Sequence, residues 1–466
     1  MSHTALRKNC NFLFNKLKTE SSIRNGSFER NLKHFSQISN LAVEGHDSPV
    51  TPENQHEAIR EVMEPFGNIS YEEQLKKKQS WSHQIREKII ERFETLKFKG
   101  NVNGCTVGKI SPSPVIEKYR NKDEFSIHYG VDGNPKTVGF FIGQLAKSNI
   151  VCVPATHLSI IKDEHKALAE VYQNFIRSSN LPVCYSLDDG GCFRTFTVRS
   201  NSAGETMAIA VSHPAERNPF DIEKEREDLL NFFQKSGVMP TSLFHQTCKS
   251  FRCTNEQSPF KLLHGEPYLY ENLLDLQFRI SPDAFFQINI EGAEVLYTEI
   301  LKLAKLKPFT TLLDLCCGTG AISLVASRKV RGCVGIESVK DAVADARINA
   351  LDNNIFNCDF VHGTVEKKLF YALRDLDMAS HVVAVVNPGR GGLHENAMET
   401  ILKCDLISQL IYVSCAADNP VAMRNFIQLT NQPRKATYKP FILTKIKPVD
   451  LFPKTRHCEL LLVFDR

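Results

Sequence analysis

The stretch that decides the fold is "LLDLCCGTGAISL", residues 312–324. An apolar run that carries Asp314 passes into Gly318-Thr319-Gly320 and then into residues with helical character. Glycines let the backbone approach a ligand closely, and a helix N-terminus offers unpaired N–H groups to it. A glycine-rich turn between a strand and a helix therefore predicts a cofactor loop.

Two classes of cofactor are compatible with this loop. A dinucleotide fingerprint has the form G-x-G-x-x-G, but Ser323 stands where the third glycine belongs. A loop for S-adenosylmethionine needs an acid before the glycines and another at the end of the next strand, and Asp314 and Glu337 occupy these positions. The pattern favours S-adenosylmethionine, with Gly318 and Gly320 forming the turn. A tight turn without a ligand is the third possibility.

Strands and helices alternate around the loop over residues 286–466. Five apolar segments in βα order predict an α/β domain with a doubly wound, mostly parallel, Rossmann-like sheet. They are "TLLDLCC", "RGCVGIES", "CDFVHGT", "HVVAVVN" and "QLIYVSC". The last two apolar runs, "KPFILTKIKPVD" and "CELLLVFD", predict a terminal antiparallel hairpin. Ligands of such sheets bind at the carboxyl ends of the strands, which is where Asn387 and Cys415 stand.

Residues 69–285 have a different texture. A helical pattern over 71–96 is followed by short alternating runs broken by Gly, Pro, Asn and Asp. Hairpins are predicted within 124–143 and 192–212, and a helix is predicted over 221–237. We therefore expect a mixed, mainly antiparallel α+β domain.

Residues 1–68 read as a presequence and a polar linker. Through Val43, seven Lys or Arg residues stand against two acidic residues, and they are interleaved with Leu and Phe. This composition is typical of a mitochondrial transit peptide and indicates a matrix location; a disordered basic tail is the alternative. No apolar run approaches the roughly 20 residues that span a bilayer. The 14 cysteines contain no CxxC pair, which predicts free thiols in a reducing compartment and no metal site.

Three segments besides the loop carry candidate chemistry. "DAFFQIN" contains Phe286 and Gln287, "VVNPGRGG" contains Asn387 and Arg390, and "KTRHCELLL" contains a carboxylate, Glu459, on an apolar strand. Each has a structural alternative, such as core packing for the aromatic residue or a salt bridge for the carboxylate. Asn387-Pro388 alone would also suggest methylation of amino groups, but the aromatic residue usual after it is missing.

Together these residues resemble the RNA uracil-5-methyltransferase family. The similarity extends from about Ile69 to the C-terminus. It includes, in order, "FFQIN", "DLCCGTGAISL", "GIE", "NPGRGGLH", "YVSC" and "VDLFPKTRHCE". Within the family, the Asn-Pro variant and "SYEEQLK" resemble the animal mitochondrial members.

The resemblance implies a role for each matching residue. Cys415 is implied to be the nucleophile that adds to uracil C6, and Glu459 the base that removes the C5 proton. Gln287, Glu337 and Asn387 are implied to contact S-adenosylmethionine. The implied substrate is the T-loop uridine of mitochondrial tRNA, with mitochondrial small-subunit rRNA as a second RNA. The segment "SPVIEKYRNKDEFSI" resembles the family's RNA-facing region, so residues 69–285 are implied to form an RNA-binding domain.

Two departures from the family pattern leave an alternative open. Asn387 stands where the family usually has Asp, and Gly389 stands where it has a second Pro. A catalytically decayed RNA-binding or assembly factor is therefore the competing hypothesis. The residues expected to meet RNA are Phe286 by stacking, Arg390 beside Cys415, and a basic patch of Lys118, Arg120 and Lys122. Core packing for Phe286 and an ordinary solvated surface for the patch are the alternatives.

Overall fold

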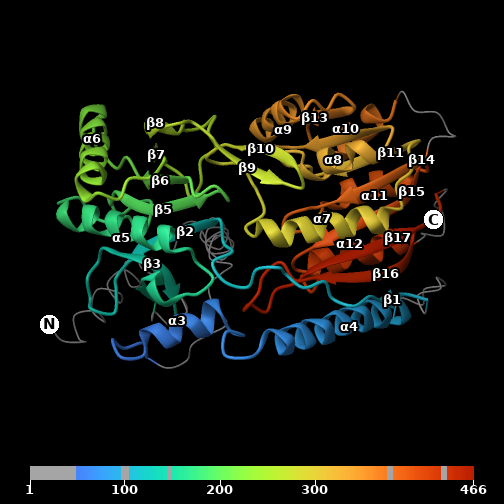
Figure 1. Cartoon of the computed structure of the whole chain (residues 1–466), viewed down its shortest axis with the longest axis horizontal. Coiled ribbons are helices and arrows are strands. Elements are labelled where there is room, and N and C mark those ends of the chain that lie inside the picture. The colour runs from blue at the N-terminus through green and yellow to red at the C-terminus, as the bar shows by residue number, and fades with distance from the viewer. Residues whose placement is uncertain (1–48, 96–103, 144–149, 375–380, 432–437) are drawn as a thin grey trace, which may run out of the picture.

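The computed structural model describes residues 49–95, 104–143, 150–374, 381–431 and 438–466. The predicted presequence lies outside these residues. Two sheets, each with its own helices, lie side by side (Figure 1). One short strand of the C-terminal sheet comes first in the chain, the whole N-terminal sheet follows, and the other strands of the C-terminal sheet come last. No helix in the described ranges is long and apolar enough to cross a membrane.

The C-terminal sheet has eight strands, and its order explains how distant segments meet. The strands are β1 (Thr106–Val107), β11 (Thr310–Leu315), β12 (Gly332–Glu337), β13 (Cys358–His362), β14 (His381–Val386), β15 (Ile407–Ser414), β16 (Ile442–Val449) and β17 (Glu459–Asp465). Their spatial order is β1-β16-β17-β15-β14-β11-β12-β13. Neighbours from β11 to β15 are parallel, whereas β17 runs antiparallel to both β15 and β16. The predicted mostly parallel sheet and terminal hairpin are confirmed.

Helices cover both faces of this sheet. One layer contains α7 (Ile290–Ala304), α8 (Ala321–Ala326), the short η3 (Ser327–Lys329) and α9 (Lys340–Asp352). The other contains α4 (Tyr71–Thr95), α10 (Val365–Ala372), α11 (Glu395–Lys403) and α12 (Pro420–Thr430). Side chains alternate along β14: Val383 and Val385 pack with the first layer, and Val382 with the second. Burial on both faces explains why the strand reads as an unbroken apolar run.

The N-terminal sheet has seven strands in the order β4-β3-β2-β5-β6-β7-β8. They are β2 (Lys122–His128), β3 (Thr137–Ile142), β4 (Val151–Val153), β5 (Phe193–Ser200), β6 (Thr206–Ser212), β7 (Ser242–Thr247) and β8 (Lys261–Gly265). The two predicted hairpins form as β2–β3 and β5–β6. Neighbouring β6 and β7 are parallel because α6 (Pro219–Ser236) crosses between them and ends, as predicted, at Gly237. The remaining elements are η2 (Ala155–His157), α5 (Asp163–Ser178) and the hairpin β9 (Leu269–Leu273) with β10 (Leu276–Ile280).

Two segments differ from the predicted boundaries. Part of the expected polar linker forms α3 (Gln55–Met63), whose Ala58, Ile59 and Met63 are buried in the core of the N-terminal sheet. Val62 of the same helix, partly buried, also packs against this core, so four apolar residues on an otherwise polar helix suffice for the packing. The helix α4 and strand β1, expected in the RNA-binding domain, join the C-terminal sheet instead (Figure 1). The other domain boundaries stay predictions.

The expectation of free thiols throughout is wrong for one pair. Cys248 and Cys253 form a disulfide, with their Cα atoms 5.7 Å apart. Four residues lie between the two cysteines, so the pair does not have the CxxC spacing.

Gly320 closes the glycine turn in a conformation that only glycine adopts easily. Its φ is +84°, and an added Cβ would lie 2.8 Å from the ring of Phe360. Gly204 has the same φ but open space around it. We expect Gly204→Ala to cost about 1–2 kcal/mol for the left-handed backbone alone. Gly320→Ala should cost about 1–3 kcal/mol more, because the methyl group overpacks the site.

Denaturant unfolding followed by circular dichroism measures this difference. Equal destabilisation by Gly204→Ala and Gly320→Ala would show that Phe360 does not confine the turn.

Candidate active site

The candidate site lies at the edge of the C-terminal sheet where parallel strands end. Glu337 is the last residue of β12, Asn387 directly follows β14, and Cys415 directly follows β15. The backbone N–H of Asn387 donates to the carbonyl oxygen of Leu315, 3.1 Å away, at the end of β11. The predicted site residues from separate segments therefore share one edge of the sheet.

Asp314 braces the glycine loop from beneath. It is fully buried, and its Oδ2 accepts hydrogen bonds from the backbone N–H (3.0 Å) and hydroxyl (2.9 Å) of Ser323. These bonds fix the start of α8 against β11. The other oxygen, Oδ1, is buried and has no hydrogen-bond partner among the described residues. Burial raises the pKa of Asp314 to about 7.

Glu337 ties the loop to the end of β12. Its carboxylate accepts from the backbone N–H groups of Gly318 at 3.1 Å and Val339 at 2.8 Å, and the residue stays partly exposed. Gly318 has a φ of +53° with no atom near the place of a Cβ. A half-exposed acid, an unpartnered buried oxygen on Asp314 and open space at Gly318 fit a polar cofactor such as S-adenosylmethionine.

Gln287 enters from the segment that precedes α7. Its carbonyl oxygen accepts from Nδ2 of Asn121 at 2.8 Å, and its side chain hydrogen-bonds to Tyr297 of α7. Asn289 caps α7 by accepting from the N–H of Gly292 at 2.9 Å, while its Nδ2 donates to the carbonyl oxygen of Leu451 at 3.1 Å. The Gln287 segment is thus held between the two sheets.

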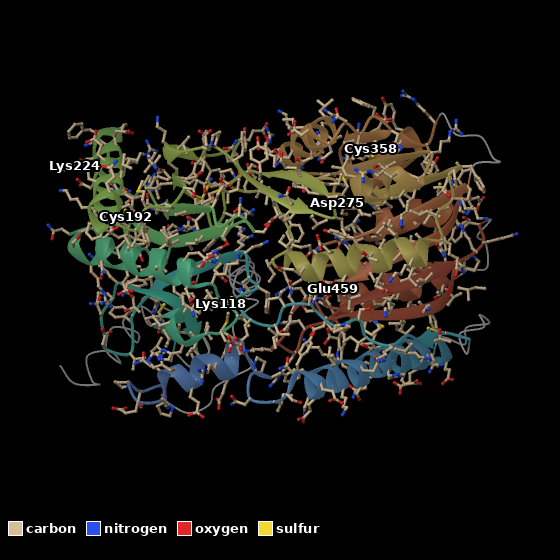
Figure 2. All side chains as sticks on the ribbon, viewed as in Figure 1. Lys118, Cys192, Lys224, Asp275, Cys358 and Glu459 are labelled. Carbon is tan, nitrogen blue, oxygen red and sulfur yellow. A yellow bond between two sulfur atoms is a disulfide. The ribbon has the colours of Figure 1, made fainter. Side chains whose placement is uncertain are left out.

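Strand register brings Cys415 to Glu459. Ser414 pairs with Leu460 across β15 and β17, so the next residues in each direction, Cys415 and Glu459, adjoin at the end of this ladder. Arg390 hydrogen-bonds to the Cys415 side chain and interacts electrostatically with Glu459. Glu459 lies in the middle of the molecule near α7, where the two halves face each other (Figure 2).

The three side chains form an electrostatically coupled group. Burial raises the pKa of Glu459 from 4.5 to about 8, and Arg390 offsets part of this rise. Burial, and then the charge of Glu459, raise the pKa of the Cys415 thiol to about 11, again opposed by Arg390. At neutral pH the protein without ligands therefore holds a neutral thiol beside a largely protonated carboxyl group. A nucleophile beside a base with a raised pKa can bond to one atom of a substrate while the base moves a proton at a neighbouring atom.

The comparisons with known proteins agree with this geometry. Residues 261–466 match the family described as tRNA (Uracil-5-)-methyltransferase. The chain is 42% identical over 428 residues to the tRNA (uracil-5-)-methyltransferase homolog B of Homo sapiens, covering 88% of this chain and 84% of the relative. The homolog B of Pongo abelii is also 42% identical over 428 residues, covering 88% of this chain and 87% of that relative. The chain belongs to the tRNA (uracil-5-)-methyltransferase family. The family predicted from the sequence is thereby confirmed.

A solved structure supports the fold. The Pyrococcus abyssi tRNA (uracil-54, C5)-methyltransferase, crystallised in complex with S-adenosyl-L-homocysteine, superposes with a TM-score of 0.59 at 20% identity. The similarity covers 86% of this chain and 84% of that chain. The predicted α/β architecture of this family member is therefore confirmed.

Of the adjacent residues Phe285 and Phe286, one is exposed and the other is buried. Phe286, expected to stack on RNA or to pack in the core, is 6% exposed and packs with Phe278 at a ring-centroid distance of 5.6 Å. Phe285 is 65% exposed. Successive side chains on an extended segment point to opposite sides, so the residue free to stack is Phe285.

The three residues of the predicted basic patch have different surroundings. Arg120 is 12% exposed and donates to Asp123 at 2.5 Å, so its guanidinium is held mainly within the protein, and its contact with RNA stays a prediction. Lys118 pairs with the exposed Asp163. Lys122 is different: the charge of Arg199 and burial lower its pKa to about 7.

Arg199 connects this basic pair to the candidate site. Its Nη2 donates to the carbonyl oxygen of Ala284, which directly precedes Phe285. Of the predicted basic residues, Lys122 therefore lies beside the segment that carries the exposed ring.

Sequence reasoning missed three residues of this region. Phe285 belongs to the "DAFFQIN" segment, but the sequence alone gives it no role, and Tyr297 lies in no recognisable motif. Lys78 had a detectable signal, because it falls on the buried stripe of α4 with Ser82 and Ile85. A lysine on an apolar stripe implies a buried partner.

The raised pKa of Glu459 predicts a pH-dependent stability. The folded state holds this proton more tightly than the unfolded chain, so the resulting stabilisation is complete below about pH 4.5 and is lost as the pH rises through about 8. Glu459→Gln has no proton to lose. Relative to the wild type, we expect its free energy of unfolding to rise between pH 5 and pH 8 by on the order of 4 kcal/mol.

Chemical unfolding at several pH values measures this divergence. Glu72→Gln is the control, since Glu72 is exposed and its pKa is lowered by Lys76. Parallel curves for the wild type and Glu459→Gln would contradict a buried, proton-retaining carboxyl group.

Proposed function

We propose that this member of the family methylates C5 of uridine in tRNA, with S-adenosylmethionine as the methyl donor. The observation that carries the proposal is the convergence of Cys415, Glu459 and Arg390 at the sheet edge that also holds the glycine loop. Family membership and the substrate in the relatives' names support tRNA as the RNA.

Uracil C5 is too weak a nucleophile to accept a methyl group directly. In the reacting form, Cys415 and Glu459 have both lost their protons to solvent. The thiolate of Cys415 bonds to C6, and the electrons of the C5–C6 double bond shift to form an enolate. The donor supplies an electrophilic methyl group on a sulfonium; C5 bonds to that methyl and displaces a neutral thioether. Dividing the reaction in this way replaces one difficult step by two easier ones.

The second half of the reaction requires a base. Glu459, as a carboxylate, takes the C5 proton, the C5–C6 double bond re-forms, and the bond from C6 to Cys415 breaks with its electrons returning to sulfur. A carboxylate whose pKa is near 8 is a stronger base than an exposed one. Arg390 has the charge and the hydrogen bond needed to hold the thiolate at both ends of the cycle.

The target base must leave its stack before these residues can reach it. Extrusion costs a few kcal/mol, which stacking and contacts to the backbone offset. The exposed ring of Phe285 supports a stacking role beside Gln287. Lys122, next to the same segment, supports a contact to an adjacent phosphate, because an anion would offset its repulsion by the buried Arg199.

The roles of Cys415 and Glu459 predict losses of activity at two different steps of the reaction. Cys415→Ala should abolish methylation of a tRNA transcript, since no bond to C6 can form. Glu459→Gln should lower turnover by about 10²–10⁴-fold, while methyl transfer to C5 still occurs. Transfer of a labelled methyl group to the transcript measures both, and Cys184→Ala, in the connection between α5 and β5, is the control.

Residual turnover by Cys415→Ala comparable to the wild type would contradict the nucleophile. A wild-type protein that binds tRNA tightly but transfers no methyl group would instead establish the decayed RNA-binding factor, for which Asn387 and Gly389 are the motivation.

We also propose that the chain acts in the mitochondrial matrix, on tRNA and on small-subunit rRNA. The basic, acid-poor segment through Val43 supports this location. In cells lacking the protein, we expect 5-methyluridine to disappear from the T-loop of mitochondrial tRNA and from one site in mitochondrial rRNA. Mapping of 5-methyluridine measures both losses. Unchanged mitochondrial RNA, or a mature protein in mitochondria that retains Met1, would contradict the proposal.

A further inference from the structure

A buried ion pair joins the N-terminal helix to the segment before Glu459. Nζ of Lys78 lies 2.7 Å from Oδ1 of Asp450, and the two side chains are 1% and 0% exposed. The same ammonium group donates to the carbonyl oxygen of Phe452 at 2.8 Å. Lys78 thus binds both a side chain and the backbone of the segment that follows β16.

Two more residues on the same face of α4 hold this segment. The hydroxyl of Tyr71 donates to Oδ2 of Asp450 at 3.0 Å and accepts from the N–H of Ser113 at 2.7 Å. Oε1 of Gln74 accepts from the N–H of Lys454 at 2.8 Å. Tyr71, Gln74 and Lys78 are spaced three and four residues apart, so they form one row on the helix. We call this row the α4 clamp.

The clamped segment is the connection that delivers Glu459. Val449, the last residue of β16, pairs with Glu459, the first residue of β17. Asp450 follows Val449 directly, and the next eight residues return the chain to Glu459. The thiol of Cys458 donates to the carbonyl oxygen of Val449 at 3.3 Å, which closes the connection at its base. A shift of Asp450 would therefore move the start of β17.

A buried ion pair contributes little net stability to the contact between a helix and a loop. Desolvation of a buried pair offsets much of its attraction, and well-packed apolar residues stabilise such a contact as well or better. Unlike apolar contacts, charged and hydrogen-bonded contacts require a defined orientation of the two groups. The pair of Lys78 and Asp450 is therefore better explained by geometry than by stability.

We propose that Lys78 and Tyr71 are positioning residues for the catalytic base, because they hold Asp450 so that Glu459 faces the C5 proton. The inference rests on the proposed role of Glu459. Neither residue touches the substrate; each acts through the connection between β16 and β17.

The reaction sequence offers a readout that loss of folding would not produce. Addition of Cys415 and methyl transfer both precede proton removal. A displaced base therefore stalls the reaction with the methylated uridine still bonded to Cys415. An unfolded or non-binding variant forms no such adduct.

The experiment is a single turnover with excess enzyme, a tRNA transcript and a donor labelled on the methyl group. Label is counted in a protein–RNA adduct that survives denaturant and in free RNA. The variants are Tyr71→Phe, Lys78→Met, and Lys78→Met combined with Asp450→Leu, which removes both charges. Lys76→Met is the matched control, since Lys76 is on the same helix but 73% exposed. Glu459→Gln is the reference for a missing base.

We expect Glu459→Gln to retain most of the label in the adduct. Tyr71→Phe and Lys78→Met should raise the adduct fraction at least tenfold over the wild type, and Lys76→Met should match the wild type. The double variant should fold and still accumulate adduct, because apolar packing does not restore the orientation of the segment that leads to Glu459. If Lys78→Met fails to fold, Tyr71→Phe and the double variant decide.

Wild-type release by the folded clamp variants, or slow turnover without adduct, would overturn the positioning role. If Glu459→Gln itself accumulated no adduct, the proposed function of Glu459 would fail and the clamp would fail with it. Adduct in Glu459→Gln but not in the clamp variants would overturn the clamp alone.

Discussion

The insertion of β17 between β15 and β16 is the constraint on which the site depends. An antiparallel strand in an otherwise parallel sheet begins at the edge where its neighbours end. Glu459 therefore starts its strand beside Cys415, which follows the end of β15. A parallel β17 would place Glu459 at the opposite edge, a full strand length away. The topology of one strand thus brings together two residues that are 44 positions apart.

Burial gives this pair its chemistry. The same apolar surroundings raise the pKa of Glu459 and of Cys415, and Arg390 opposes both shifts. One cation cannot fully stabilise two anions in a region of low dielectric, so the resting pair stays largely neutral. Once Glu459 has lost its proton, its raised pKa lets it hold a proton taken from the substrate. The N-terminal helix adds rigidity to this arrangement through its buried pair with the β16–β17 connection.

Much of this could be predicted from the sequence, and the exceptions have physical causes. Apolar runs and the glycine loop are local patterns, so they predicted the sheet, the terminal hairpin and the residues at the strand ends. The place of β17 in the sheet depends on pairing between distant segments, which no local pattern encodes. Phe285 and Phe286 are chemically identical, and only the backbone direction decides which is buried. Arg120 reads as a surface cation until its ion pair with buried Asp123 is known.

The central claim is that Cys415 bonds to the uridine that is methylated. Its most direct test uses a tRNA transcript in which 5-fluorouridine replaces the T-loop uridine, since fluorine at C5 leaves no proton for Glu459 to remove. Mass spectrometry of the digested adduct then identifies the attached residue. We expect one RNA-linked peptide, which contains Cys415 and carries both the fluorine and the transferred methyl group. An adduct on any other residue, or methyl transfer to ordinary tRNA without any adduct on the fluorinated one, would contradict it.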